Sequence, residues 1–329
     1  MTRRTGMAFN TMMRADATAT RRIALIAAPS NLGLMPQPGE REPGARKAPD
    51  VLQSLGISER LGAESSRTVS APPYSPEVDA TTGVRNAPAL RRYSETLADA
   101  VGEELNAGRF PLVIGGDCSV LLGPALALRR RGRHGLIFFD GHTDFKLPAT
   151  SPSKGAAGMD LAFVTGHGPA PLVDFGEHTP LFQEADTIAF GYRDLRDPAT
   201  YTSKALFETQ VQRMDLTEVR RRGVSHAARA ALDAVGGDAV EGVFIHFDVD
   251  VLDSEIMSAV DTPEPGGFLP AEAVEALRTW CADPRVIGIE VTIYDPDRDP
   301  DRRCGKLLVD ILSAALCGHR QHLNERFVT

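Results

Sequence analysis

Residues 136–145 read LIFFDGHTDF: four apolar residues followed by Asp140, His142 and Asp144, which are spaced two apart. A continuous apolar run of this length is typical of a strand that is buried on both faces of a parallel sheet. The three polar residues have side chains of the types that bind metal ions. Because ligands gather where the strands of such sheets end, the stretch predicts a buried strand with a binding site at its carboxyl end.

Similar apolar runs recur along the chain and alternate with helical patterns. This alternation predicts an α/β fold, a three-layer sandwich with a central, mainly parallel sheet. We expect strands at 23–28, 110–114, 136–139, 187–190, 243–247 and 286–291, and helices at 89–107, 120–131, 225–235, 270–281 and 306–317.

The chain has no repeat and no low-complexity linker that would separate two domains. We therefore expect a single α/β domain over residues 22–329. Residues 1–21 contain several Arg and Thr residues and one acidic residue. This composition weakly resembles a transit peptide, but we interpret the segment as a disordered N-terminal extension.

Composition excludes several classes of partner. The net charge of -8 over 329 residues, without basic runs, argues against binding to nucleic acid or to an anionic membrane. No apolar run approaches the roughly 18 residues of a membrane span. Four cysteines without CxxC spacing favour a reducing, cytoplasmic location. The expected partner is a small molecule.

A second acidic cluster lies in FIHFDVDVLD at 244–253, where Asp248 and Asp250 again follow an apolar run. Residues two apart on an extended chain project to the same side. Two carboxylates this close repel each other, and burying them is costly unless cations neutralise the charge. Alone, this motif could be a solvated loop or a helix cap. Together with LIFFDGHTDF it predicts a site for two divalent metal ions.

Two further strand ends carry polar residues. In VIGGDCSVLLG at 113–123, Cys118 follows a Gly-Gly turn at the start of an expected helix, where a thiolate is favoured. A buried structural thiol and a catalytic nucleophile are the alternatives. In VIGIEVTIYDPDRDP at 286–300, Glu290 interrupts an apolar strand, so that its carboxylate is expected to be paired or functional.

Together these four motifs resemble those of the ureohydrolases, the family of arginases, agmatinases and formiminoglutamases. IALIAAPSNLG at 23–33 and ARKAPDVLQSLGI at 45–57 also resemble the family's opening strand and first helix. The resemblance implies two Mn²⁺ ions that share a bridging hydroxide, which attacks the guanidinium-type carbon of the substrate. One ion would be held by Cys118, Asp140, Asp144 and Asp248, and the other by Asp140, His142, Asp248 and Asp250. Asp144 would orient the hydroxide, and Glu290 would pair with the cationic amidine.

The chain departs from the family pattern at the site itself. Cys118 stands where the family has a histidine ligand, and a thiolate is a softer donor, so Zn²⁺, Fe²⁺ or Ni²⁺ could replace Mn²⁺. Ala157 occupies the place of the family's proton-shuttling histidine and can move no proton. His167 is expected to be a surface or capping residue. His246 replaces a common serine, and we expect it to pack in the core or to support the metal ligands.

The expected substrate-binding residues depart in part as well. Ser153 and Thr262 match the family pattern. Arg196 stands where arginases present an acid to the substrate's α-amino group, and Lys146 replaces an asparagine. Both cations would repel an α-ammonium group, which predicts a substrate other than arginine. Solvated loop charges are the alternative.

The sequence therefore predicts a metal-dependent hydrolase of linear C–N bonds in a guanidino or amidino compound, and not a standard arginase. A deacetylase of the same broad fold is less favoured, because Glu290 suits a cationic substrate. The alternative from another class is a catalytically silent homologue that serves as a structural or regulatory subunit, suggested by Cys118 and Ala157. The resemblance also implies a homo-oligomer, a trimer or hexamer.

Overall fold

The strands of the protein form one parallel sheet in the computed structural model, which describes residues 21–194 and 204–317. Every neighbouring pair of strands in this sheet is parallel. The eight strands are β1 (Ile23–Ala28), β2 (Ser65–Thr68), β3 (Phe110–Gly115), β4 (Gly135–Phe139), β5 (Thr187–Phe190), β6 (Gln212–Met214), β7 (Val243–Asp248) and β8 (Val286–Thr292), in the spatial order β2-β1-β3-β8-β7-β4-β5-β6.

The six strands expected from apolar runs are all present, with ends within one residue of the predicted ones. The sequence did not predict β2 and β6, which are the two edge strands. β2 reads SSRT and β6 reads QRM, and both are partly exposed. Short strands of this kind lack a continuous apolar run because they are not buried on both faces.

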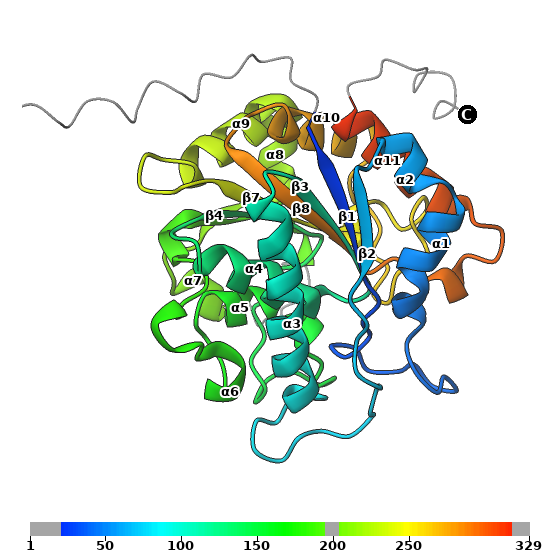
Figure 1. Cartoon of the computed structure of the whole chain (residues 1–329), viewed down its shortest axis with the longest axis vertical. Coiled ribbons are helices and arrows are strands. Elements are labelled where there is room, and N and C mark those ends of the chain that lie inside the picture. Colours follow the sequence, from blue (N-terminus) through cyan, green and yellow to red (C-terminus); the bar gives the residue numbers. More distant parts are fainter. Residues whose placement is uncertain (1–20, 195–203, 318–329) are drawn as a thin grey trace, which may run out of the picture.

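Helices cover both faces of the sheet (Figure 1). One face carries α1, α2, α8, α9, α10 and α11, and the other carries α3 to α7. The helices are α1 (Ala48–Ser54), α2 (Ile57–Leu61), α3 (Ala87–Asn106), α4 (Leu122–Arg129), α5 (Asp160–Val164), α6 (Ala170–Val173), α7 (Lys204–Phe207), α8 (Leu216–Arg222), α9 (Val224–Val235), α10 (Pro270–Cys281) and α11 (Arg303–Leu316). The predicted three-layer α/β sandwich is confirmed. The helix expected at 120–131 is divided into a 3-10 turn at Cys118–Leu121 and α4.

Alternating side chains of the strands feed two separate cores. In β4, Ile137 and Phe139 belong to the core under α8 to α11, whereas Leu136 and Phe138 belong to the core under α3 to α6. This follows from the period of two in a strand, which sends neighbouring side chains to opposite faces. Both faces are buried, which explains the continuous apolar runs.

The order of the strands brings distant parts of the chain together. β3, β8, β7 and β4 are neighbours in the middle of the sheet, although other elements separate them in the sequence. The polar residues of three motifs follow or end β3, β4 and β7, and Glu290 lies inside β8, two residues before its end. Parallel strands have their carboxyl ends at the same edge, so the topology alone places the motifs side by side.

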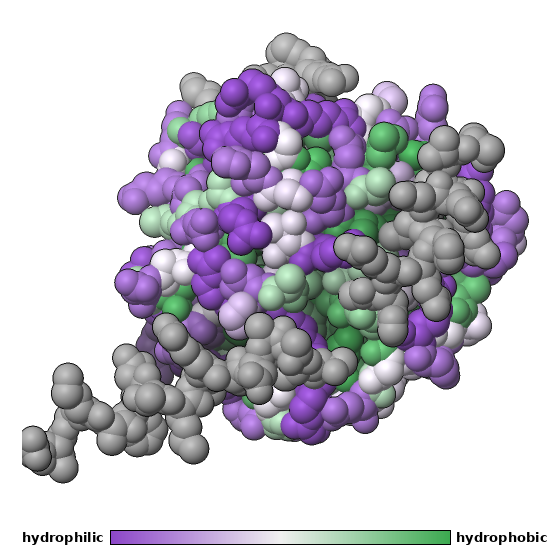
Figure 2. All heavy atoms as spheres, turned by 90° about the horizontal axis from the view of Figure 1, so that it is seen from above, coloured by the Kyte–Doolittle hydropathy of each residue, from purple (hydrophilic) through white to green (hydrophobic). Residues whose placement is uncertain are grey.

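The opposite edge of the sheet lies at the top of Figure 1, where β1 begins and α11 ends. Figure 2 views this face, on which hydrophilic residues predominate and hydrophobic residues form smaller areas among them. Arg21 is packed here: its guanidinium donates hydrogen bonds to the carbonyls of Val286 (2.5 Å) and Asp283 (2.6 Å). The extension predicted at 1–21 otherwise lies outside the described residues. None of the described helices is long and apolar enough to cross a membrane.

Trp280 is the single tryptophan of the chain and is fully buried in the core under α8 to α11. Its Nε1 donates a hydrogen bond to the carbonyl of Ala228 (2.8 Å), and its ring meets the rings of Phe139 and Phe190 edge-on. We expect Trp280→Phe to lower the free energy of unfolding by about 1–3 kcal/mol, because the hydrogen bond from the indole is lost and the smaller ring leaves a cavity in the core. Urea denaturation followed by circular dichroism measures this loss. Met35→Gln, at a position 40% exposed, is the control. An equal loss in both variants would contradict the prediction.

Candidate metal centre

Each acidic motif begins with a carboxylate that caps the turn after its strand. Asp140 Oδ1 accepts a hydrogen bond from the amide of His142 (2.6 Å), and Asp248 Oδ1 accepts one from the amide of Asp250 (2.7 Å). Since Phe139 pairs with Phe247 in the sheet, Asp140 and Asp248 follow neighbouring strands at the same level. These local hydrogen bonds engage the Oδ1 atoms, so that the Oδ2 atoms of both residues are left for other contacts.

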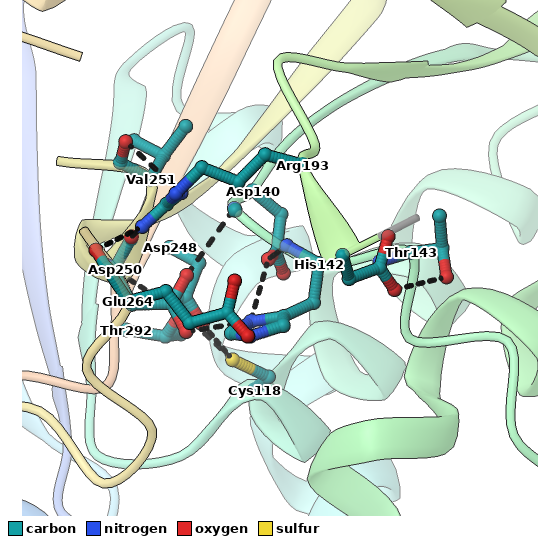
Figure 3. Close-up of polar contacts among 12 residues, drawn as sticks. Cys118, Asp140, His142, Thr143, Arg193, Asp248, Asp250, Val251, Glu264 and Thr292 are labelled. Atoms are coloured by element: carbon teal, nitrogen blue, oxygen red, sulfur yellow. Dashed lines mark hydrogen bonds and ion pairs between the residues drawn. The ribbon is translucent and has the colours of Figure 1, made fainter. Parts of the chain in front are cut away.

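The first cluster of potential ligands consists of Cys118, Asp140, His246 and Asp248, whose donor atoms lie within 4.8 Å of one another. The Cys118 thiol donates a hydrogen bond to Asp248 Oδ2 (2.7 Å). Asp140 Oδ2 lies 3.6 Å from His246 Nε2. All four side chains are buried. Figure 3 shows Cys118 and Asp248 pointing toward each other, with Thr292 beside them.

The second cluster shares Asp140 with the first and adds His142 and Asp250. His142 Nδ1 lies 2.9 Å from Asp250 Oδ2, and His142 Nε2 lies 3.7 Å from Glu264 Oε1. Arg193 ties the surrounding loops together, since it donates hydrogen bonds to the carbonyls of Asp250 (2.9 Å) and Glu264 (2.8 Å) (Figure 3). The structure thus brings five of the six residues predicted as metal ligands into two adjoining clusters.

The structure places His246 in the first cluster, where the sequence indicated only packing or a supporting role. In the sheet, His246 lies between Phe138 of β4 and Glu290 of β8. Its ring stacks on Phe138 with centroids 4.4 Å apart, and Nδ1 lies 2.6 Å from Glu290 Oε1. Glu290 is fully buried. Glu290 is the carboxylate expected to pair with the substrate, and one of its two oxygens therefore already has His246 as a hydrogen-bond partner.

Asp160, the first residue of α5, is an acidic residue of this region that the sequence analysis did not identify. It is fully buried, and its Oδ2 lies 4.0 Å from His246 Nε2. The signal was present, because Asp160 interrupts the apolar run GMDLAF. A charge inside such a run must be paired or functional.

Burial dominates the electrostatics of the site. It raises the pKa of the Asp140, Asp160 and Asp248 carboxyls well above the usual range, and neighbouring acids raise it further. Burial also raises the pKa of the Cys118 thiol, and Asp248 adds to the effect. The expectation that a helix start favours the Cys118 thiolate is therefore wrong for the metal-free site. Desolvation and nearby carboxylates outweigh the short 3-10 turn.

Asp250 and His142 form the exception. Burial alone would raise the pKa of Asp250, but His142 holds it below its usual value. In turn, burial would lower the pKa of His142, but the charge of Asp250 raises it well above its usual value. These two side chains are thus a buried ion pair. Among the described residues, Asp140, Asp160 and Asp248 have no histidine, lysine or arginine nitrogen this close; the nearest histidine nitrogen lies 3.6 Å from Asp140 and 4.0 Å from Asp160.

Several buried polar atoms of the site have no hydrogen-bond partner in the described part of the chain. They include Asp140 Oδ2, Asp160 Oδ2, His246 Nε2 and Glu290 Oε2. A buried donor or acceptor without a partner is costly, and each such group calls for an explanation. Carboxylate, imidazole and thiolate groups are the ligands of divalent transition-metal ions. The residues present therefore fit bound cations.

The remaining predicted residues lie around these clusters or outside the described chain. Asp144 belongs to neither cluster, but its charge raises the pKa of Asp160, so it lies close by. Ser153 is half-buried and Thr262 is exposed. Arg196 lies outside the described residues.

Ala157, at the place of the family's proton-shuttling histidine, and His167 differ in their surroundings. Ala157 is buried, and its amide donates a hydrogen bond to the carbonyl of Gly33 (3.1 Å). His167 Nε2 lies 2.7 Å from Glu184 Oε1, and the side chain is 38% exposed. This pairing is typical of a surface histidine.

Comparison with known proteins gives a consistent picture. A model of the Arginase family matches residues 21–318. The arginase of Bacillus caldovelox is 27% identical over 296 residues, which cover 89% of this chain and 97% of that protein. Its native crystal structure has a TM-score of 0.81 at 25% identity, over 92% of this chain and 100% of that chain. The formimidoylglutamase of Bacillus subtilis has the same fold, with a TM-score of 0.67 at 21% identity over 92% of this chain and 89% of that one.

Neutralising Asp248 should stabilise the metal-free protein. Asp248→Asn removes a negative charge beside Asp140 and Asp250 but keeps the oxygen that caps the turn. We expect the melting temperature of chelator-treated protein to rise by at least about 2 °C, which corresponds to roughly 1 kcal/mol. Added metal ions should then raise it less than in the wild type.

Asp250→Asn is the matched control, because it breaks the ion pair with His142 and should lower the melting temperature of the metal-free protein. Differential scanning calorimetry measures both variants. A fall for Asp248→Asn as large as that for Asp250→Asn would show that repulsion among the acids is not the dominant interaction.

Proposed function

Since the chain belongs to the arginase family, we propose that it is a metal-dependent hydrolase that cleaves a linear C–N bond in a guanidino or amidino compound. The observation that carries this proposal is the meeting of two ligand clusters at Asp140, where four parallel strands end. Two cations would neutralise the carboxylates that burial and repulsion make costly. The relatives named as arginase and formimidoylglutamase support a hydrolase of the amidinohydrolase type.

Bound at these clusters, two divalent cations supply Lewis acidity and lower the pKa of a water that attacks the substrate carbon. Asp140, which belongs to both clusters, would hold both cations, and Asp248 would hold the cation at Cys118 and, by the family resemblance, the second one as well. Asp144, which belongs to neither cluster, would accept a hydrogen bond from the attacking water and orient it.

Glu290 is proposed to pair with the cationic amidine, but through one oxygen. Oε1 is held by His246 (2.6 Å), whereas Oε2 has no partner among the described residues. A single charge-assisted hydrogen bond fixes a planar cation less firmly than a bidentate contact does. Substrate orientation therefore depends more on Ser153 and Thr262, and on Arg196, which lies outside the described residues.

The substrate is proposed to differ from arginine. Lys146 is half-buried in the loop after Asp144, and with Arg196 it would repel an α-ammonium group. Ala157 cannot carry protons to a leaving amine. A substrate whose leaving group needs less help, or one protonated by another group, would suit this site.

The metal and the assembly are parts of the same proposal. Mn²⁺ is the first choice from the family resemblance, and Zn²⁺, Fe²⁺ and Ni²⁺ follow because of the Cys118 sulfur. From the same resemblance, we propose a homo-oligomer, a trimer or hexamer, in the cytoplasm. Light scattering coupled to size-exclusion chromatography tests the assembly.

A substrate screen with reconstituted protein tests the function. The protein is stripped with a chelator, loaded with each of the four metals, and incubated with guanidino, amidino and formimino compounds. We expect turnover of at least one compound, and a loss of more than about 100-fold in kcat/KM for Asp140→Asn, because even changes behind the metal ligands cost about 10–100-fold. Asp99→Asn, at an exposed carboxylate that pairs with Arg130, is the control and should retain activity.

The catalytically silent homologue is the second candidate, and Ala157 is the observation that favours it. Protein that binds metal ions but turns over no compound of the panel would support it and contradict the hydrolase. Turnover that survives Asp140→Asn would contradict the proposed role of the metal centre.

A further inference from the structure

We propose that His246 is a ligand of the metal ion at Cys118 and that Glu290 positions its ring. This ion would then be held by one thiolate, one imidazole and two carboxylates, from Cys118, His246, Asp140 and Asp248. The inference rests on the proposed metal centre, but it requires no reaction to take place there.

The sheet itself places His246 at the cluster. His246 and Asp248 are two apart on β7, so both side chains project to the same side of the sheet. The neighbouring strands place Phe138 on one side of His246 and Glu290 on the other. The imidazole thus lies on one face of the sheet, between the side chains of Phe138 and Glu290.

The contacts of the ring orient it for metal binding. Nδ1 lies 2.6 Å from Glu290 Oε1, where an ionised carboxylate accepts the Nδ1 proton, and the ring face stacks on Phe138. With the proton on Nδ1, the lone pair of Nε2 points away from Glu290. Metal-binding histidines donate their other N–H to a carboxylate or carbonyl in this way, which fixes the tautomer and the ring orientation.

The Nε2 atom is buried and has no hydrogen-bond partner among the described residues. Its nearest carboxylate oxygens are Asp140 Oδ2 at 3.6 Å and Asp160 Oδ2 at 4.0 Å. Both distances exceed that of a hydrogen bond, whereas the contact with Glu290 does not. A histidine whose main role was to bridge these acids would be expected to close on them. The open arrangement instead leaves room for an ion.

This ligand set explains two substitutions together. The family pattern has a histidine where this chain has Cys118 and a common serine where it has His246. The chain therefore keeps one imidazole at this ion, supplied from β7 instead of from the turn after β3. Asp144, which the family pattern assigns to the same ion, does not belong to the cluster. A set with a thiolate and an imidazole favours Zn²⁺, Co²⁺ or Fe²⁺ over Mn²⁺.

Cobalt reconstitution tests the proposal without any substrate. We expect the wild type to bind two Co²⁺ ions with a thiolate-to-cobalt absorption band that Cys118→Ser removes. His246→Gln should weaken binding of one ion by more than about 100-fold, and Glu290→Gln by about 10–100-fold, while the ion at His142 stays bound. Retention of that second ion also shows that each variant is folded.

Two further variants distinguish the ligands. Asp144→Asn should change the affinity of the Cys118 ion less than His246→Gln does. His167→Gln, at a partly exposed histidine paired with Glu184, is the control and should leave both ions unchanged. Equal cobalt affinity and an unchanged spectrum in His246→Gln would overturn the proposal, as would a larger loss in Asp144→Asn. Should His246→Gln not fold, an unchanged affinity in Glu290→Gln would overturn the positioning role. Cobalt affinity and the absorption spectrum do not depend on turnover. A protein without activity that shows these changes would therefore still support the ligand set.

Discussion

The cost of burying several carboxylates close to one another is the constraint on which the site depends. Asp140, Asp160, Asp248, Asp250 and Glu290 are all buried near the carboxyl ends of β4, β7 and β8 or at the start of α5. Asp250 is compensated by His142, and Glu290 by its hydrogen bond to His246. Asp140, Asp160, Asp248 and also Glu290 have raised pKa values, because burial disfavours their charged forms. Such a cluster is stable only if cations or protons neutralise it, and divalent ions do so at neutral pH.

The sheet makes this concentration of charge achievable. Its order places β3, β8, β7 and β4 next to one another, so that the turns after these strands lie side by side at one edge of the sheet although they are far apart in the sequence. Two apolar cores hold these strands from both faces and prevent the acids from moving apart. The packing of the whole domain thus offsets the unfavourable free energy of burying these acids together. Interiors packed this densely resist local relaxation.

In the proposed ligand set, the exchange at Cys118 and His246 keeps one imidazole at the ion but adds a potential negative charge. A thiol carries one potential negative charge where the family pattern has a neutral imidazole. A histidine on the adjacent strand restores the nitrogen donor and also engages Glu290. The same hydrogen bond removes one oxygen from substrate binding. If both proposals hold, metal preference and substrate preference are linked through the imidazole of His246.

The sequence by itself determined the fold class, the six buried strands and the motifs that supply most of the clustered residues, because continuous apolar runs and acids at their ends are local patterns. It could not determine the edge strands β2 and β6, whose short polar segments become strands only by pairing with a neighbour. It also could not determine that His246 joins the cluster and forms a hydrogen bond with Glu290, or that Asp160 lies close to His246. Those contacts join residues of β4, β7, β8 and α5, and only the tertiary structure, through strand order and register, brings their side chains within reach.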